Sequence, residues 1–241
     1  MYKVLFLFIL LSFGSICNAT DYSAIDRYAQ TAPQASSESK LRQTVMFLTR
    51  PYSTDTEKAR ALLAWLVYNF DYNDFQYQEY INDVQHHRTS STLSPDLWKT
   101  RLGVCTDFAE LYVKMLKMIN IKSHVVSGYA GYDVTKKHAE EYRHAWVYAE
   151  IEREDVFIDP TWAMTAGSEK KHITTKSEYR ADLRKRRAPQ KTLDTTKSVK
   201  SEWFLVPPEK MIKTHFPDQV ENQFLTRKIS WHEFLMGQKK Q

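Results

Sequence analysis

The stretch Gly103-Val104-Cys105-Thr106-Asp107-Phe108-Ala109-Glu110-Leu111 begins a segment in which apolar residues recur at every third or fourth position. This spacing is the period of one face of an α-helix. The apolar positions are Phe108, Leu111, Tyr112, Met115, Leu116 and Ile119. We therefore predict that Cys105 begins a helix with a buried face, and that Gly103 lets the backbone turn closely into it.

The position of Cys105 makes it a candidate nucleophile. At the start of a helix, backbone N–H groups and the helix dipole favour the thiolate, which is the reactive form of a thiol. The same N–H groups can bind the oxyanion of an acyl-transfer reaction. Helix starts are common, however, and a lone cysteine is often only a small buried apolar side chain. The position alone leaves both interpretations open.

The N-terminus has the pattern of a secretory signal peptide. Lys3 precedes an apolar run of about ten residues, VLFLFILLSF, which is too short to span a bilayer, and the small residues Cys17-Asn18-Ala19 follow. We predict cleavage after Ala19, a secreted or periplasmic location, and no transmembrane segment in the mature chain. Lipidation of Cys17 is the alternative, but Ile16 does not suit such a site. Cleavage would leave Cys105 as the single thiol, unable to form an internal disulfide.

The composition is that of a globular protein. The chain has 241 residues, of which 42% are hydrophobic and 26% are charged, which excludes wholesale disorder and a membrane-embedded body. We predict one catalytic domain with flanking segments. These segments are a signal peptide at 1–19, a helical lead-in at 20–50, a catalytic core at 51–167, a basic loop or insertion at 168–200, and a C-terminal extension at 201–241 that packs on the core.

Turn residues and periodicity predict helices before Cys105 and strands after its helix. One helix is predicted from residue 38 to 50, where Pro51 stops it, and another after the N-cap candidates of residues 53–57. Residues 71–100 are predicted as loop with short helical pieces. Strands are predicted at 123–130, 144–151 and 156–159, where β-branched and aromatic residues dominate. A helix followed by an antiparallel sheet is an α+β order.

One strand register brings His144 and Asp159 together. If Ile151 and Glu154 flank a two-residue turn, each pair of facing residues on the two strands has numbers that sum to 305. His144 then lies opposite Thr161, and Asp159 is its diagonal neighbour on the same face of the sheet. A three-residue turn would place the two on opposite faces. With Cys105 they form a candidate triad, in which His144 transfers protons and Asp159 orients its ring. Taken singly, each is more commonly structural, as a sheet histidine and as the start of a turn.

Three short motifs resemble the core of the transglutaminase-like superfamily. They are Gly103 to Leu111, His144-Ala145-Trp146-Val147 and Ile158-Asp159-Pro160-Thr161-Trp162, in this order. The tail is similar to the kyphoscoliosis-peptidase branch through Trp203-Phe204-Leu205-Val206-Pro207-Pro208, Met211-Ile212 and Thr214-His215-Phe216-Pro217. The resemblance runs from about residue 50 to the end. Its core motifs are specific as a set, whereas the tail marks a lineage without indicating a function.

This resemblance implies a papain-like α+β fold, in which the nucleophile-bearing helix packs on an antiparallel sheet. It also implies that Cys105, His144 and Asp159 are catalytic, in peptide hydrolysis, amide crosslinking or deamidation. A side-chain oxyanion donor is often supplied upstream of the cysteine, and Trp98 is the candidate here, with a place in the core as the alternative. Four further aromatic residues either line a substrate groove or pack locally: Tyr72, Phe75, Tyr77 and Tyr80.

The sequence thus predicts an exported cysteine enzyme that acts on peptide or carboxamide bonds through a Cys105 thioester, as a protease, amidase or crosslinking acyltransferase. The alternative is an inactive module of the same fold that binds a peptide or a cell-wall component. The histidines show no zinc-site spacing and no calcium-loop signature is present, so neither a metal nor another cofactor is predicted. Histidines outside the triad, including His215, are interpreted as surface or core residues.

Residues 168–200 are locally basic: eleven Lys or Arg against four Asp or Glu give a net charge of 11 − 4 = +7, compared with +5 for the whole chain. Few of the other residues are apolar, so we predict a solvated loop or helix outside the core. Such a stretch could bind an anionic glycan or membrane surface. Nucleic acid is not expected as a partner of an exported enzyme.

Overall fold

The computed structural model describes residues 20–82, 97–164, 176–186 and 197–238. The predicted signal peptide at 1–19 and much of the basic stretch therefore lie outside the described residues. Within the described ranges, no helix is both long and apolar enough to cross a membrane.

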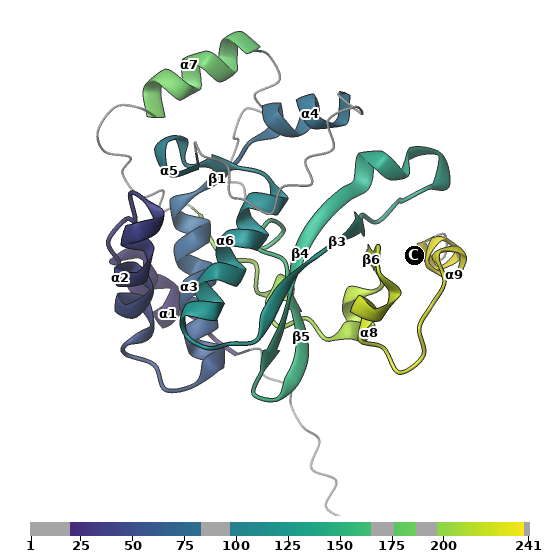
Figure 1. The fold of residues 1–241 in the computed structure, drawn as a ribbon, viewed down its shortest axis with the longest axis horizontal. Coiled ribbons are helices and arrows are strands. Elements are labelled where there is room, and N and C mark those ends of the chain that lie inside the picture. The colour runs from purple at the N-terminus through teal and green to yellow at the C-terminus, as the bar shows by residue number, and fades with distance from the viewer. Residues whose placement is uncertain (1–19, 83–96, 165–175, 187–196, 239–241) are drawn as a thin grey trace, which may run out of the picture.

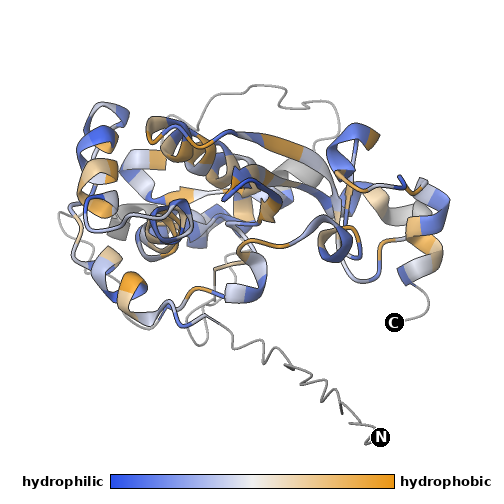
Figure 2. Ribbon diagram, turned by 90° about the horizontal axis from the view of Figure 1, so that it is seen from below, coloured by the Kyte–Doolittle hydropathy of each residue, from blue (hydrophilic) through white to orange (hydrophobic). Residues whose placement is uncertain are grey.

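Helices form one layer of the fold, beside the sheet (Figure 1). The layer contains α1 (Ser23–Gln30), α2 (Glu38–Thr49), α3 (Asp55–Asn69) and α6 (Cys105–Met118). The central helix is α3, which is buried throughout from Ala59 to Asn69. It begins with a capping box, in which Thr54 Oγ1 accepts the N–H of Glu57 and the Glu57 carboxylate accepts the N–H of Thr54. Figure 2 shows hydrophobic and hydrophilic residues alternating along most helices, as expected for helices that cover a core on one side.

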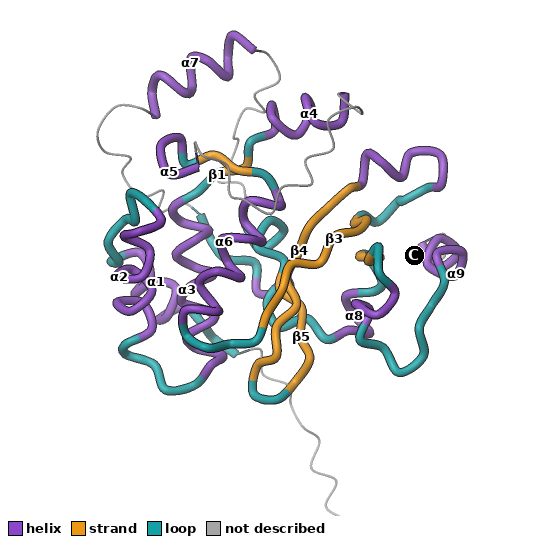
Figure 3. The backbone as a smooth tube through the Cα atoms, in the orientation of Figure 1, coloured by secondary structure: helices purple, strands orange, loops and turns teal. Residues whose placement is uncertain are grey.

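The main sheet has the strand order β5-β4-β3-β6, and all neighbouring strands are antiparallel (Figure 3). Its strands are β3 (Ser123–Ala130), β4 (Arg143–Ile151), β5 (Glu154–Ile158) and β6 (His215–Pro217). The 3-10 helix η1 (Lys136–Tyr142) connects β3 to β4. Alternate residues of β4 face opposite cores, because Val147 lies in the cluster under the helices whereas Trp146 and Tyr148 lie in a cluster on the other face.

A second, two-stranded sheet borders the start of α6. Here β1 (Asp71–Tyr72) runs parallel to β2 (Leu102–Gly103), flanked by the short helical pieces α4 (Asp74–Asn82) and α5 (Leu97–Thr100). The N–H of Asn73 donates to the carbonyl of Gly103 at 2.8 Å. Gly103 packs closely, since a Cβ there would lie 2.9 Å from side-chain atoms of both Leu97 and Phe108. The predicted close turn into the helix is therefore confirmed, whereas the strand pair was not predicted.

Most of the C-terminal residues lie against the sheet face opposite the helices, although Phe204 belongs to the core on the helix side (Figure 1). They form η2 (Ser201–Trp203), α8 (Pro208–Met211), β6, η3 (Val220–Gln223) and α9 (Trp231–Gln238). Phe157 of β5 and Val206 exchange two backbone hydrogen bonds, of 2.8 and 2.7 Å. The tail is thus tied to both edges of the sheet, at β5 and through β6 on β3.

Two parts of the basic stretch are described, and they differ. The hydrophilic helix α7 (Lys176–Arg186) stacks Tyr179 on Phe75, with ring centroids 4.7 Å apart. Lys197, in contrast, is buried, and its ammonium donates to the carbonyls of Val67 and Phe70 and pairs with Asp71 at 2.6 Å. Because the C-terminal carbonyls of α3 have no partner within the helix, this ammonium satisfies them. The solvated character predicted for the whole stretch does not extend to Lys197.

Candidate active site

The hairpin between β4 and β5 sets the position of Asp159 relative to His144. Ile151 pairs with Glu154 and Val147 with Ile158, so paired residue numbers sum to 305 as predicted. Both turn residues, Glu152 and Arg153, adopt positive φ angles of 53° and 69°, which is the backbone of a tight two-residue hairpin turn. The Glu152 carboxylate accepts the N–H groups of Asp55 and Thr56 at the start of α3, at 3.0 and 3.3 Å, and this holds the turn against the helix layer.

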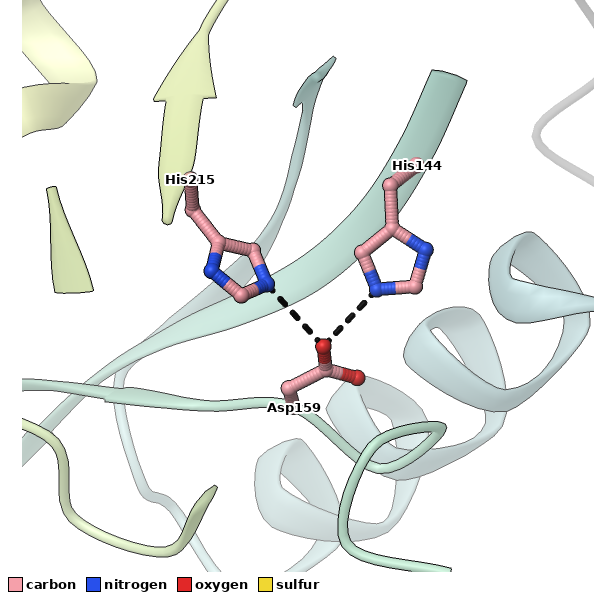
Figure 4. A group of neighbouring side chains, drawn as sticks. All are labelled: His144, Asp159 and His215. Atoms are coloured by element: carbon pink, nitrogen blue, oxygen red, sulfur yellow. Dashed lines mark hydrogen bonds and ion pairs between the residues drawn. The ribbon is translucent and has the colours of Figure 1, made fainter. Parts of the chain in front are cut away.

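Asp159 is completely buried and accepts hydrogen bonds at both carboxylate oxygens. Its Oδ2 lies 2.8 Å from Nε2 of His144 and 3.1 Å from Nε2 of His215 (Figure 4). Its Oδ1 accepts the backbone N–H groups of Thr161 and Trp162, at 2.9 and 3.0 Å. Burial alone would raise the pKa of this carboxyl, but the two histidines hold it well below its usual range. Asp159 is therefore a buried anion.

Cys105 and His144 form the other half of the arrangement. Burial acts to raise the pKa of the Cys105 thiol, but hydrogen bonds from His144, the Ala145 N–H and Thr106 outweigh it and lower that pKa. Burial likewise acts to lower the pKa of His144, yet Asp159 and Cys105 raise it to about 10. Because Nε2 of His144 faces Asp159, Nδ1 is the nitrogen left for the thiol. The electrostatics thus shift both groups toward their charged forms, the thiolate of Cys105 and the imidazolium of His144.

A cleft of about 390 Å³ opens beside His144. Its walls are rich in aromatic side chains, including Tyr72, Tyr77, Tyr142 and Trp162, and they also carry the carboxylates of Asp74 and Glu141. Tyr77 and Tyr72 are thus groove residues, whereas Phe75 packs against α7. The side chain of Tyr80 lies outside the described residues. A peptide segment that entered this cleft would pass the imidazole.

The model of the transglutaminase-like superfamily matches residues 42–160, a range that contains Cys105, His144 and Asp159. Residues 42–160 are a transglutaminase-like domain. The family match, together with the packing of α6 on the antiparallel sheet, confirms the predicted family and the α+β papain-like fold.

The chain also resembles two curated proteins. It is 24% identical over 217 residues to the kyphoscoliosis peptidase of Mus musculus and 24% identical over 216 residues to that of Homo sapiens. The alignments cover 89% and 88% of this chain but only 29% and 28% of the relatives. The chain therefore spans less than a third of the length of these relatives.

Two solved structures overlap with part of the chain. The crystal structure of a TGase covers 69% of this chain and 39% of its own, at 17% identity and a TM-score of 0.39. The periplasmic domain of TgpA from Pseudomonas aeruginosa covers 58% of this chain and 47% of its own, at 21% identity and a TM-score of 0.38.

The structure does not bring Trp98 into the cleft of the transglutaminase-like domain. The Trp98 ring packs edge to face on Phe70, with centroids 6.0 Å apart, against the main hydrophobic core. Among the described residues, the aromatic side chain at the cleft that interacts electrostatically with Cys105 is Tyr72. Burial, with the neighbouring negative charges, raises the pKa of Tyr72 well above its usual value, so its hydroxyl stays protonated. Tyr72 therefore presents a protonated hydroxyl at the cleft.

His215 is the site residue that the sequence interpretation missed. The sequence predicts a surface or core histidine; the side chain lies in the core, as one of these alternatives has it, but its Nε2 also faces Asp159. His215 belongs to the Thr214-His215-Phe216-Pro217 motif of the tail, whose resemblance to the kyphoscoliosis-peptidase branch was the available signal. The motif gave no indication of where the imidazole would lie.

His144, Asp159 and His215 place three ligand-type atoms within 4.8 Å of one another. Such residues can bind a metal, but here both Nε2 atoms are directed at the same oxygen, Asp159 Oδ2. These two hydrogen bonds account for the arrangement, and a metal bound by the same atoms would break both. The prediction that no metal is required remains to be tested with a chelator.

Proposed function

We propose that the protein is an exported cysteine enzyme that cleaves or transfers peptide or carboxamide acyl groups through a thioester on Cys105. The observation that supports it best is the connected series of Asp159, His144 and Cys105, in which a buried anion holds an imidazolium beside a thiol of lowered pKa. Such an arrangement supplies a nucleophile and a general acid at neutral pH.

In the first step, the Cys105 sulfur attacks the carbonyl carbon, and the carbonyl π electrons move to oxygen. The resulting oxyanion is bound by backbone N–H groups at the start of α6, and we assign the side-chain donor to Tyr72 in place of Trp98. As the tetrahedral intermediate collapses, the C–N bond breaks and His144 gives its proton to the leaving amine or ammonia. The acyl group remains on sulfur as a thioester.

In the second step, water or an amine attacks the thioester carbonyl, and His144 accepts the proton of this nucleophile. The Cys105 thiolate then leaves, and the ion pair is restored. Water yields a carboxylic acid, as in a protease or amidase, whereas an amine yields a new amide, as in a crosslinking enzyme. The aromatic cleft beside His144 suits a peptide substrate.

The test is iodoacetamide alkylation of the mature protein across pH, with the labelled residue identified by mass spectrometry. We expect Cys105 to be labelled well below the usual thiol pKa of about 8.5, and His144→Ala to weaken this low-pH labelling. Lys122→Ala, which removes an exposed ion-pair partner of Glu150, serves as the control. An ordinary thiol profile that is identical in wild type and His144→Ala would refute the proposal and favour a binding module.

Activity is tested next on a glutamine-containing peptide, with and without a fluorescent primary amine. Release of new N-termini, release of ammonia or incorporation of the amine distinguishes proteolysis, deamidation and crosslinking. Cys105→Ala should abolish whichever product forms. Export is tested by N-terminal sequencing of the protein recovered outside the cytoplasm, where Thr20 is expected as the first residue.

A further inference from the structure

The C-terminal tail places a second histidine against Asp159. His215 is the first residue of β6 and pairs with Ala130 of β3. Its Nε2 lies 3.1 Å from Asp159 Oδ2 (Figure 4). Its Nδ1 lies 2.8 Å from Oγ1 of Thr214. The ring also packs against Trp162 and Trp146, with centroid distances of 4.6 and 5.0 Å. Its position is therefore fixed by contacts on several sides.

Burial and the hydrogen-bond partners of His215 together indicate its protonation state. An ionised carboxylate only accepts, so Nε2 of His215 carries a hydrogen and donates it to Asp159. The Thr214 hydroxyl can then donate to Nδ1 of a neutral ring. Burial lowers the pKa of His215 to about 4, against the opposing effect of Asp159. His215 is thus a neutral donor over the pH range in which the Cys105 and His144 pair forms.

This donor completes the coordination of the carboxylate. Asp159 accepts four hydrogen bonds, two at each oxygen, from Thr161, Trp162, His144 and His215. A carboxylate held in this way cannot rotate away from His144 without losing bonds, and protonating it would displace a donor. Among the described residues, the other titratable groups that interact electrostatically with Asp159 include His144 on β4 and Tyr72 on β1, and Cys105 on α6 interacts with His144.

We propose that His215 is a positioning residue of the active site, which keeps Asp159 ionised and aimed at His144. The tail is then part of the catalytic machinery. This inference rests on the proposed function, because it concerns the same nucleophile. Without the His215 donor on the same oxygen, the carboxylate would be less firmly aimed at His144, the imidazolium would lose part of its hydrogen bond, and the thiolate of Cys105 would form only at higher pH.

The experiment measures the pH dependence of Cys105 alkylation in four variants of the full chain. His215→Phe removes the donor but keeps an aromatic ring among the tryptophans, whereas His215→Gln keeps an N–H near the position of Nε2. Thr214→Val removes the hydroxyl that orients the ring. His124→Phe is the matched control, since His124 on β3 is bonded to Asn222 of the tail at 3.2 Å and makes no hydrogen bond to Asp159. Folding is checked by circular dichroism and thermal unfolding.

On the acidic side of the pH profile, called here the acid limb, the alkylation rate of Cys105 rises as the thiol ionises. We expect this acid limb to lie about one pH unit higher in His215→Phe, so that at the lowest pH values the alkylation rate is about tenfold lower than in the wild type. Thr214→Val should give a smaller shift in the same direction, while His215→Gln and His124→Phe should stay near wild type. An unchanged limb in His215→Phe would overturn the inference and leave His215 a structural role. If His215→Phe does not fold, an unchanged limb in Thr214→Val, or a full shift in His215→Gln, overturns it instead. An ordinary thiol profile in the wild type would refute the proposed function itself.

Discussion

Replacing Asp159 with asparagine removes the buried negative charge while preserving the shape of the side chain. The amide oxygen of Asp159→Asn can still accept the N–H groups of Thr161 and Trp162, so the turn after β5 is retained. The amide NH₂ then faces Nε2 of His144 and of His215, both of which donate to the carboxylate in the wild type. The imidazolium loses its charged partner, and burial becomes the dominant influence on the pKa of His144.

The size of the effect follows from the hydrogen bond that is lost. A hydrogen bond to a charged group contributes about 1.5–3 kcal/mol, and one pKa unit corresponds to about 1.36 kcal/mol. Loss of this bond alone should lower the pKa of His144, raised to about 10 in the wild type, by at least one to two units, and burial, no longer opposed by the carboxylate, should lower it further, so that the ring is neutral near pH 6. Without an imidazolium beside it, the Cys105 thiolate should form only at a pH about one to two units higher. Near pH 6, alkylation should be about 10- to 100-fold slower.

The assay is the iodoacetamide rate from pH 4 to 10, with labelling at Cys105 confirmed by mass spectrometry. The rates of wild type and Asp159→Asn should converge near pH 10, where the thiol ionises without help. Asp155→Asn is the matched control, because Asp155 lies on the exposed end of β5 and accepts the Tyr148 hydroxyl. A rate near pH 6 that stays within twofold of wild type in a folded Asp159→Asn protein would refute the electrostatic argument.

Four further outcomes are expected. Tyr72→Phe should lower the acylation rate on a peptide about 10- to 100-fold while leaving the acid limb of alkylation near wild type, and equal losses in both would argue against an oxyanion donor. Gly128→Ala would place a Cβ 2.1 Å from the carbonyl oxygen of Phe216, so it should displace β6 and lower the free energy of unfolding by about 1–3 kcal/mol in urea denaturation; no loss would contradict the packing. Lys197→Met leaves Asp71 buried without its ammonium partner and should cost about 3–5 kcal/mol, whereas the exposed Lys122→Met should cost less than about 1 kcal/mol, and similar losses would disprove the distinction. Activity should survive EDTA, and its loss, with recovery on adding a divalent metal, would show that the His144, Asp159 and His215 group binds an ion.

Strand register was the part of the site that could be predicted from the sequence. Side chains alternate with a period of two, so one assumption about the turn placed His144 and Asp159 on the same face. The turn residues themselves gave no support, because Glu152 and Arg153 are not residues that favour positive φ. The contact that accounts for the turn joins Glu152 to the start of α3, across 97 residues, and no local pattern reveals such a contact.

The misplaced and missed residues have a common physical cause. Trp98 was chosen for its chemistry and its position upstream of Cys105, but the small parallel sheet of β1 and β2 directs Tyr72 toward the cleft and leaves Trp98 on Phe70. Strands of two residues are too short for alternation to be detected. The same holds for β6, which has three residues and places His215 next to Asp159, a residue 56 positions earlier in the chain. Short strands that complete a site are set by tertiary packing.

The contacts of Asp159 argue against treating the residues after 201 as an accessory to the transglutaminase-like domain. The N–H of Asp159 donates to the carbonyl of Trp203 at 3.0 Å, and its carboxylate accepts from His215. The ring of Trp203 packs edge to face on Trp162, whose N–H binds the other carboxylate oxygen. The core supplies Cys105, His144 and three of the four donors to the Asp159 carboxylate, while the tail supplies the fourth donor and contacts the backbone and the adjoining turn of Asp159. A change in how the tail packs would therefore alter the position of the buried Asp159 carboxylate, and through His144 the pKa of the Cys105 thiol, although the tail itself need not contact the cysteine.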